Sequence, residues 1–194
     1  MKKSMVYIRG LDRLESLLKI ILLGQSTAGS AIVRKTWGCI SLVLITICVP
    51  LVSYSQNFDS GLEAYQRGDY TKAYGKWYLS SLEGHVVAKA NLGVLYMEGL
   101  GVLQNHRKAY ELLSQAAQMG IPFAQFNLAL MYEKGRGLPQ DRTRAHMWYN
   151  LAASNGHQPA ITARANVARY MTAPSILVAE ELASKCLEGG YQDC

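Results

Sequence analysis

Apolar residues recur through residues 85–120 at the spacing of α-helical turns, and polar residues fill the positions between them. They form two stripes, separated by a short polar and glycine-rich segment. The stripes are Ala88, Leu92, Leu95 and Tyr96, then Ala109, Leu112, Leu113, Ala116 and Ala117. This pattern predicts a pair of amphipathic helices, with the apolar stripe of each facing a common core.

The sequence pattern of this helix pair occurs a second time. Residues 85–120 align with residues 121–156 without a gap, and 11 positions are identical, where ordinary composition would give about two or three. The second copy has its own stripe at Ala145, Trp148, Tyr149, Ala152 and Ala153. A fixed period of this length is typical of a solenoid, in which each unit buries its apolar face only against its neighbours.

Each copy contains a Gly-x-Gly segment, at residues 99–101 and 135–137, which could hold a phosphate or only turn the backbone. Both segments follow a predicted helix and not a strand. Gln104 and Gln140 stand where a dinucleotide-binding fingerprint needs its third glycine. Asn105 and Asp141 come next, where their side chains can cap the following helix. We therefore predict that each segment ends one helix and turns the chain toward the next.

These residues resemble the Sel-1-like repeats, which are relatives of the tetratricopeptide repeats. Residues 85–120 carry the family's pattern with Asn105 for an Asp and Leu112 for a Trp, and residues 121–156 carry it with Ala129 for a Gly and Leu138 for a Val. The resemblance implies an all-α fold, an α-α superhelix (solenoid) of helix pairs. The implied units are about 57–84, 85–120 and 121–156, followed by a capping helix pair at 157–194, with Thr172 as the N-cap of its second helix.

The first 55 residues differ from the rest and are typical of a leader. Arg34 and Lys35 precede an uncharged apolar run at residues 37–52, and Ser53 and Ser55 suit a signal-peptidase site before Gln56. The core of this signal peptide is 33–55, and residues 1–32 can be a mis-annotated start. We expect a periplasmic or secreted protein. An uncleaved leader that anchors the chain in the inner membrane is the alternative.

The positive charge of the chain belongs mainly to this leader. Residues 1–55 hold seven basic and two acidic residues, whereas residues 56–194 hold 13 basic and 12 acidic residues. The nearly neutral remainder lacks the basic face that nucleic-acid backbones require, so we expect no nucleic-acid partner.

Residues that could carry chemistry are sparse. None of His85, His106, His146 and His157 has a catalytic partner or second metal ligand at motif spacing, so we predict no catalytic, metal or cofactor site and no cofactor. The expected protein is not an enzyme. An alternative follows from the resemblance, because some family members with repeated cysteine pairs have been linked to penicillin binding. It is a periplasmic enzyme-like protein acting on peptidoglycan or β-lactams, although the Ser-x-x-Lys pair of such enzymes occurs only at Ser16 and Lys19, inside the leader.

The four cysteines divide between the leader and the rest. Cys39 and Cys48 lie in the apolar run, and Cys186 and Cys194 remain in residues 56–194. An even number of cysteines in an exported chain favours a disulfide between the last two, which would hold the tail against the final helix. Free thiols are the alternative.

The resemblance also implies a partner-binding surface. If the first helix of each unit lines a concave face, as in tetratricopeptide relatives, an apolar strip with charged edges results. Its residues are Ala90, Val94, Met97, Glu98, Phe126, Leu130, Glu133 and Lys134. Such a strip suits an extended peptide or a helix, so we expect an exported adaptor or scaffold that binds another protein. Phe126 and Leu130 can instead be ordinary core residues, and the solenoid can instead self-associate without a ligand.

Overall fold

The structure is a computed structural model that describes residues 56–192 and 194. Every regular element in this part of the chain is a helix, which confirms the predicted all-α fold. Residues 56–66 are helical and form the first element of the described part. The others are α3 (Tyr70–Leu82), α4 (Val86–Glu98), α5 (His106–Gln118), α6 (Pro122–Lys134), α7 (Arg142–Ser154), α8 (Gln158–Ala168) and α9 (Ala173–Glu188). The predictions about the leader concern residues 1–55 and lie outside the described residues.

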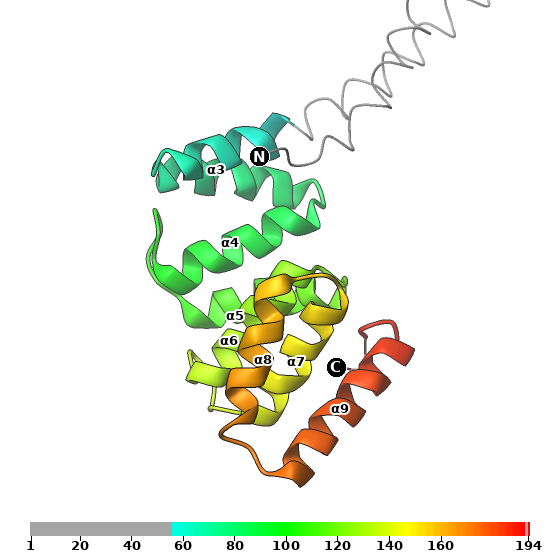
Figure 1. Cartoon of the computed structure of the whole chain (residues 1–194). Helices are drawn as coiled ribbons and strands as arrows, with labels where there is room; N and C mark the ends of the chain where they lie inside the picture. The colour runs from blue at the N-terminus through cyan, green and yellow to red at the C-terminus, as the bar shows by residue number, and fades with distance from the viewer. Residues whose placement is uncertain (1–55, 193) are drawn as a thin grey trace, which may run out of the picture. The chain divides into compact units, whose positions relative to one another are not determined.

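The helices pack against their neighbours in chain order and build a stack of helix pairs (Figure 1). Within a pair, α4 packs against α5, and α6 packs against α7. Between pairs, α3 packs against α4, and α5 packs against α6. The end of the stack departs from this order, because both α8 and α9 pack against α7. Helix α7 is therefore covered on several sides, while the outer face of α9 remains open.

Two buried apolar clusters run through the stack, and α4 contributes to both. Leu92 and Leu95 join Trp77 of the preceding unit in one cluster. Ala90 and Met97 belong to the larger second cluster, which continues through α5, α6 and α7. One helix thus serves two cores, which is how a solenoid extends its apolar interior from unit to unit.

Most residues of the predicted stripes are buried, whereas Tyr96, Leu112 and Ala153 are only partly buried. Trp148 is 3% exposed, and the alanines at positions 109, 116, 117, 145 and 152 are fully buried. The alanines allow two helix axes to approach closely. The large side chains of α7 fill the remaining space between the helices. The predicted caps are also confirmed, since Asn105, Asp141 and Thr172 each accept a hydrogen bond from a backbone N–H three residues later.

The Gly-x-Gly segments turn the backbone as predicted, and they also join consecutive units. Gly99 and Gly135 end α4 and α6 in the left-handed conformation, with φ of 70° and 66°. The second glycine of each segment approaches another helix closely. A side chain at Gly101 would collide with the backbone of Tyr70, and one at Gly137 would collide with His106. Tyr70 and His106 begin α3 and α5, so each segment packs on the second helix of the preceding unit.

The C-terminal residues fold back on earlier units through a chain of hydrogen bonds. The Tyr191 hydroxyl donates to Asn155 Oδ1 over 3.0 Å, and Asn155 Nδ2 donates to Gln125 Oε1 over 3.0 Å. Gln125 is fully buried, and its Nε2 donates to the Ala117 carbonyl. The ring of Tyr191 lies against Gly120. This network satisfies a buried amide and ties the segment after α9 to α5, α6 and α7.

Cys186 and Cys194 lie at disulfide distance, with Cα atoms 5.0 Å apart. We expect the oxidised protein to carry this bond, and we expect its reduction to destabilise the C-terminal segment by roughly 2–3 kcal/mol, because the bond closes a short loop. Mass spectrometry of an unreduced digest, followed by thermal denaturation with and without dithiothreitol, measures both effects. Two freely alkylated thiols in protein isolated from the periplasm or the medium would contradict the expectation.

Candidate partner-binding surface

The predicted strip lies on α4 and α6, two helices that contact each other directly in the stack. We use the name first-helix strip for its accessible members. These are Val94, Glu98, Phe126, Leu130, Glu133 and Lys134, all partly or fully exposed. The repeat places Val94 and Leu130 at equivalent positions of consecutive units, and likewise Glu98 and Lys134, so the strip continues from one helix to the next.

Two predicted members of the strip need correction. Ala90 is fully buried and Met97 is 2% exposed, and both belong to the core cluster that α4 shares with α5 and α6. The prediction treated the first helices as open on one whole face. The direct packing of α4 against α6 closes part of that face, so these two side chains are not available to a partner.

Phe126 combines the two roles that the sequence left open. Its ring centroid lies 5.5 Å from that of Tyr149 and 4.7 Å from that of His157, so it packs against the core cluster. It nevertheless stays partly exposed, as does Leu130. Burial lowers the pKa of His157, so its imidazole is neutral at neutral pH and suits contact with the phenyl ring. Phe126 is a half-buried side chain whose outer edge forms part of the strip.

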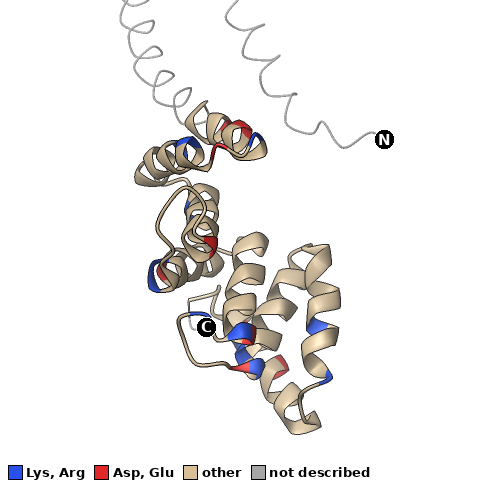
Figure 2. Ribbon diagram, turned by 90° about the vertical axis from the view of Figure 1, so that its left-hand side faces the viewer, with Lys and Arg blue, Asp and Glu red and all other residues tan. Residues whose placement is uncertain are grey.

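The charged residues of the strip are held in ion pairs. Arg136 donates to Glu98 over 2.6 Å and links α4 to the segment that follows α6. Lys134 donates to Glu133 over 2.8 Å. Basic and acidic positions are scattered over the helices of the stack (Figure 2). The strip therefore presents apolar side chains between locally neutralised charges.

The sequence analysis did not predict Arg136 as part of the surface, because Arg136 is the variable middle residue of a Gly-x-Gly segment. It faces Glu98 only because the segments of consecutive units lie one above the other. The available signal was the pair of opposite charges 38 residues apart, close to the repeat length.

Glu133 is the most constrained charge on the strip. Burial by itself would raise the pKa of Glu133, but hydrogen bonds from Lys134 and from the Tyr149 hydroxyl outweigh it and lower the pKa. The Tyr149 hydroxyl donates to Glu133 Oε2 over 2.7 Å. Burial and this hydrogen bond in turn raise the pKa of Tyr149, which stays a protonated donor. The equivalent residues in the preceding unit, Met97 and Leu113, are both buried in the core cluster, so two apolar side chains there correspond to a hydrogen-bonded pair here.

We expect Tyr149→Phe to lower the free energy of unfolding by about 1.5 kcal/mol at neutral pH, because it removes a hydrogen bond to a carboxylate. The pKa of Glu133 in the folded state lies below its ordinary value of 4.5. Its interactions therefore stabilise the fold above that value, and they are lost as the pH falls through the folded-state pKa. Urea denaturation at pH 7 and at pH 3 should show a difference between variant and parent that shrinks in acid.

Tyr78→Phe is the matched control for this measurement. Tyr78 is 47% exposed, and its hydroxyl makes no hydrogen bond to another described residue. A pH-independent loss in Tyr149→Phe would show that the ring packing was disturbed and not the bond to Glu133.

His85 serves local structure at the start of α4. The His85 Nδ1 accepts a hydrogen bond from the Ala88 N–H at the start of α4, and its ring stacks on Phe58 at 4.3 Å. His146 is buried at 4% exposure in the position that Tyr110 occupies one unit earlier. The described residues contain no cluster of three or more histidine, cysteine or acidic side chains that could hold a metal ion. None of the described helices combines the length and the hydropathy needed to span a bilayer.

Comparisons with known proteins place the repeat in a family. A family model described as the Sel1 repeat matches residues 86–121 and again residues 122–157. No match was found among curated proteins. The solved structure of a protective antigen from uropathogenic Escherichia coli strains, which displays an SLR fold, superposes with a TM-score of 0.66 and 23% identity over 71% of this chain and 31% of that one.

A second solved structure, a Sel1 repeat protein from Oxalobacter formigenes, has a TM-score of 0.52 and 34% identity, over 55% of this chain and 44% of that one. The chain thus spans less than half the length of either protein. Sel1 repeat proteins generally mediate protein–protein interactions and typically act as non-enzymatic scaffolds. The chain therefore contains two consecutive Sel1 repeats, at residues 86–121 and 122–157, and it has the helical solenoid fold of the two similar structures.

Proposed function

We propose that this protein is an exported adaptor that binds another protein through the first-helix strip. The observation that carries the proposal is the continuity of accessible apolar side chains across α4 and α6. Val94, Phe126 and Leu130 remain partly exposed on two helices that touch. Other large apolar residues of the same helices, such as Leu95 and Leu128, are buried. An apolar strip on a rigid helical scaffold suits an extended segment or a helix of a partner.

The ion pairs at the edges of the strip support a protein partner over a charged polymer. Glu98 is joined to Arg136, and Glu133 to Lys134, so the strip carries no excess of either sign. Binding there would rest on burial of apolar area, with the rim charges setting orientation. We place the site of action in the periplasm or outside the cell, because the leader is typical of export and because a cysteine pair at disulfide distance suits an oxidising compartment.

Site-specific photocrosslinking in living cells tests the proposal. A photoreactive benzoylphenylalanine is placed at Glu98 or at Leu130, both accessible in the strip, and at Leu79 as a control. Leu79 is an apolar residue of α3, the second helix of its unit, and is 48% exposed. We expect discrete crosslinked species of higher mass from the strip positions and none from Leu79. Equal crosslinking from all three positions, or none from the strip, would remove this surface from the proposal.

Export is tested separately, by N-terminal sequencing of the protein recovered from cell fractions. We expect the mature chain to begin within a few residues of Gln56, because Ser53 and Ser55 provide the small residues that signal peptidase requires. An intact leader on protein in the inner-membrane fraction would favour the anchored alternative. Recovery of the intact chain from the cytoplasm would refute export.

A further inference from the structure

A pair of contacting tyrosines occurs at each of two successive junctions between units, and the proposed function uses neither pair. The hydroxyls of Tyr74 and Tyr96 are 2.9 Å apart, and those of Tyr110 and Tyr132 are 3.3 Å apart. In each pair the rings meet edge to face. Two hydroxyls that bond to each other use only one of their two hydrogens, so each pair retains one O–H donor. No described residue accepts a hydrogen bond from it.

The retained donor of the second pair lies in a pocket of about 380 Å³. Tyr110 and Arg107 line it from the first half of α5, Tyr132 lines it from α6, and Asp141 and Arg144 line it from the start of α7. The Gly-x-Gly segment closes one side, because Gly137 is packed against the first residue of α5. Leu138 and Pro139 form an apolar wall beside these polar groups.

The pocket presents hydrogen-bond donors in excess. Asp141 is its single acidic side chain and is already engaged, because one of its oxygens accepts the Arg144 backbone N–H over 2.9 Å. The ion pairs of Arg107 and Arg144 are long, with Nε 3.6 Å from Glu111 and 3.7 Å from Asp141. Neither guanidinium group makes a hydrogen bond to a carboxylate of another described residue. Glu111 pairs with both Arg107 and Lys108, so three cations face two carboxylates in and beside the pocket, and a single positive charge remains.

Tyr132 stays a protonated donor in this setting. Burial and the hydrogen bond with Tyr110 raise the pKa of Tyr132 to about 12. The Arg144 guanidinium lies over its ring, with Cζ 5.7 Å from the centroid, which holds the guanidinium beside the hydroxyl pair.

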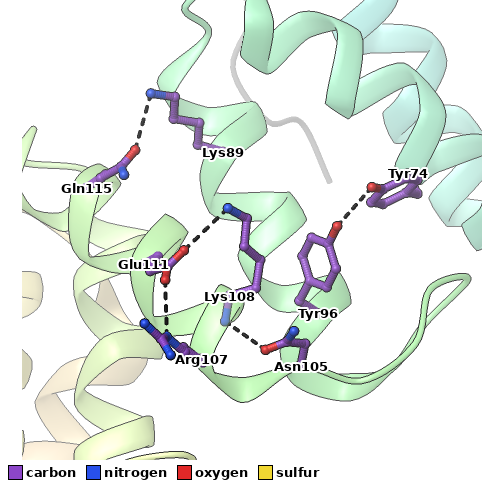
Figure 3. A network of polar contacts seen from close by, with 8 residues as sticks. All are labelled: Tyr74, Lys89, Tyr96, Asn105, Arg107, Lys108, Glu111 and Gln115. Atoms are coloured by element: carbon purple, nitrogen blue, oxygen red, sulfur yellow. Dashed lines mark hydrogen bonds and ion pairs between the residues drawn. The ribbon is translucent and has the colours of Figure 1, made fainter.

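The first tyrosine pair provides an internal comparison. Lys108 takes the position of Arg144 there, and its ammonium donates to Glu111 over 3.3 Å (Figure 3). Thr71 takes the position of Arg107, so a second cation is missing. In the next unit the position of Glu111 is occupied by Met147, which is buried. The same scaffold thus has one lysine that is hydrogen-bonded to a carboxylate in one unit, and two arginines with longer ion pairs, of 3.6 and 3.7 Å, in the next.

We propose that the pocket formed by Arg107, Tyr110, Tyr132 and Arg144 binds a carboxylate group of a peptide. A carboxylate is an acceptor of single charge, which matches the charge of the pocket, and a planar guanidinium can bond both of its oxygens. The hydroxyl supplies a third donor, and Leu138 and Pro139 can contact the chain that carries the carboxylate. The pocket is separate from the first-helix strip, and the proposal does not depend on binding at the strip.

The carboxylate can come from the end of a peptide or from an acidic side chain, and three probes distinguish these sources. The probes are acetyl-Gly-Ser-Gly-Leu with a free carboxylate, the same peptide as its amide, and acetyl-Gly-Ser-Glu-Leu amide. They are titrated at constant ionic strength into ¹⁵N-labelled protein expressed from the full chain, and the arginine Nε–Hε signals are followed. We expect saturable shifts of the Arg107 and Arg144 signals with one or both carboxylate probes, and none with the neutral amide.

Variants locate the site. Arg144→Gln and Tyr132→Phe should each weaken binding about tenfold, since each removes a donor to a charged group. Lys108→Gln and Tyr96→Phe, the equivalent changes one unit earlier, should alter it less than twofold. Circular dichroism checks folding, and Arg144→Gln decides the matter if Tyr132→Phe is unstable, because the Arg144 side chain is 57% exposed.

Three results would overturn the proposal. One is the absence of saturable shifts with either carboxylate probe. Another is equal weakening by the variants and their counterparts one unit earlier. The third is a response to inorganic phosphate at the same concentration that matches the response to the carboxylate probes, which would show general attraction of anions.

Discussion

Replacing Trp148 with Ala is expected to lower the free energy of unfolding by about 3–5 kcal/mol. Trp148 is 3% exposed and lies on α7, the helix against which α6, α8 and α9 all pack. Truncation removes the contacts of a large ring and leaves a cavity that rigid neighbouring helices cannot fill. Thermal denaturation followed by circular dichroism should show a midpoint roughly 10 °C or more below that of the parent protein.

Leu103→Ala is the control for this experiment. Leu103 is apolar but 89% exposed, so its truncation should change the free energy of unfolding by no more than about 0.5 kcal/mol. If Trp148→Ala melts with the parent protein, α7 does not occupy the centre of the core and the packing described above is wrong.

Replacing Gly101 with Ala is expected to cost about 2–5 kcal/mol, although the change adds a single methyl group. Gly101 has φ of +67°, which is unfavourable for a residue with a Cβ atom, and that atom would collide with the backbone at Tyr70. Because a backbone cannot rotate away as a side chain can, the segment must separate from α3. Urea denaturation measures the loss, and a changed slope would show that the first unit has detached.

Gly84→Ala separates the two causes of this loss. Gly84 has φ of +91° but no atom within 4 Å of the position of an added Cβ. It should therefore show only the conformational cost of roughly 1–2 kcal/mol. The additional loss in Gly101→Ala measures the contact between consecutive units. Equal losses would mean that this contact yields easily and does not hold the units in place.

These two experiments probe different parts of the same architecture. Trp148 reports on the continuous apolar core, which any amphipathic helix array requires. Gly101 reports on the contact that orients one unit on the next, which in a solenoid determines how the units align. Alignment of the units also places Glu98 beside Arg136, and places Tyr110, Tyr132 and Arg144 around one pocket. Surfaces and pockets of this protein therefore depend on contacts between units as much as on the units themselves.

The sequence by itself determined the features that depend on neighbouring residues along the chain. The helical spacing, the repeat, the glycines that end α4 and α6, and the caps at Asn105, Asp141 and Thr172 could all be read from it. Each of these depends on groups within a few residues of one another, so a local pattern is sufficient. The burial of Trp148 could also be read, because the repeat placed it on a stripe whose partner helix was known.

Only the tertiary structure decided which residues of different units meet. The sequence placed Ala90 and Met97 on the same predicted strip as Val94, but the contact between α4 and α6 buries them. The tyrosine pairs join residues 22 positions apart, and Tyr191 reaches Asn155 across 36 positions. The packing of α9 against α7 could not be predicted from the repeat either. Such contacts depend on the relative rotation of whole helices, and the small differences in packing that set this rotation leave no periodic signal along the chain.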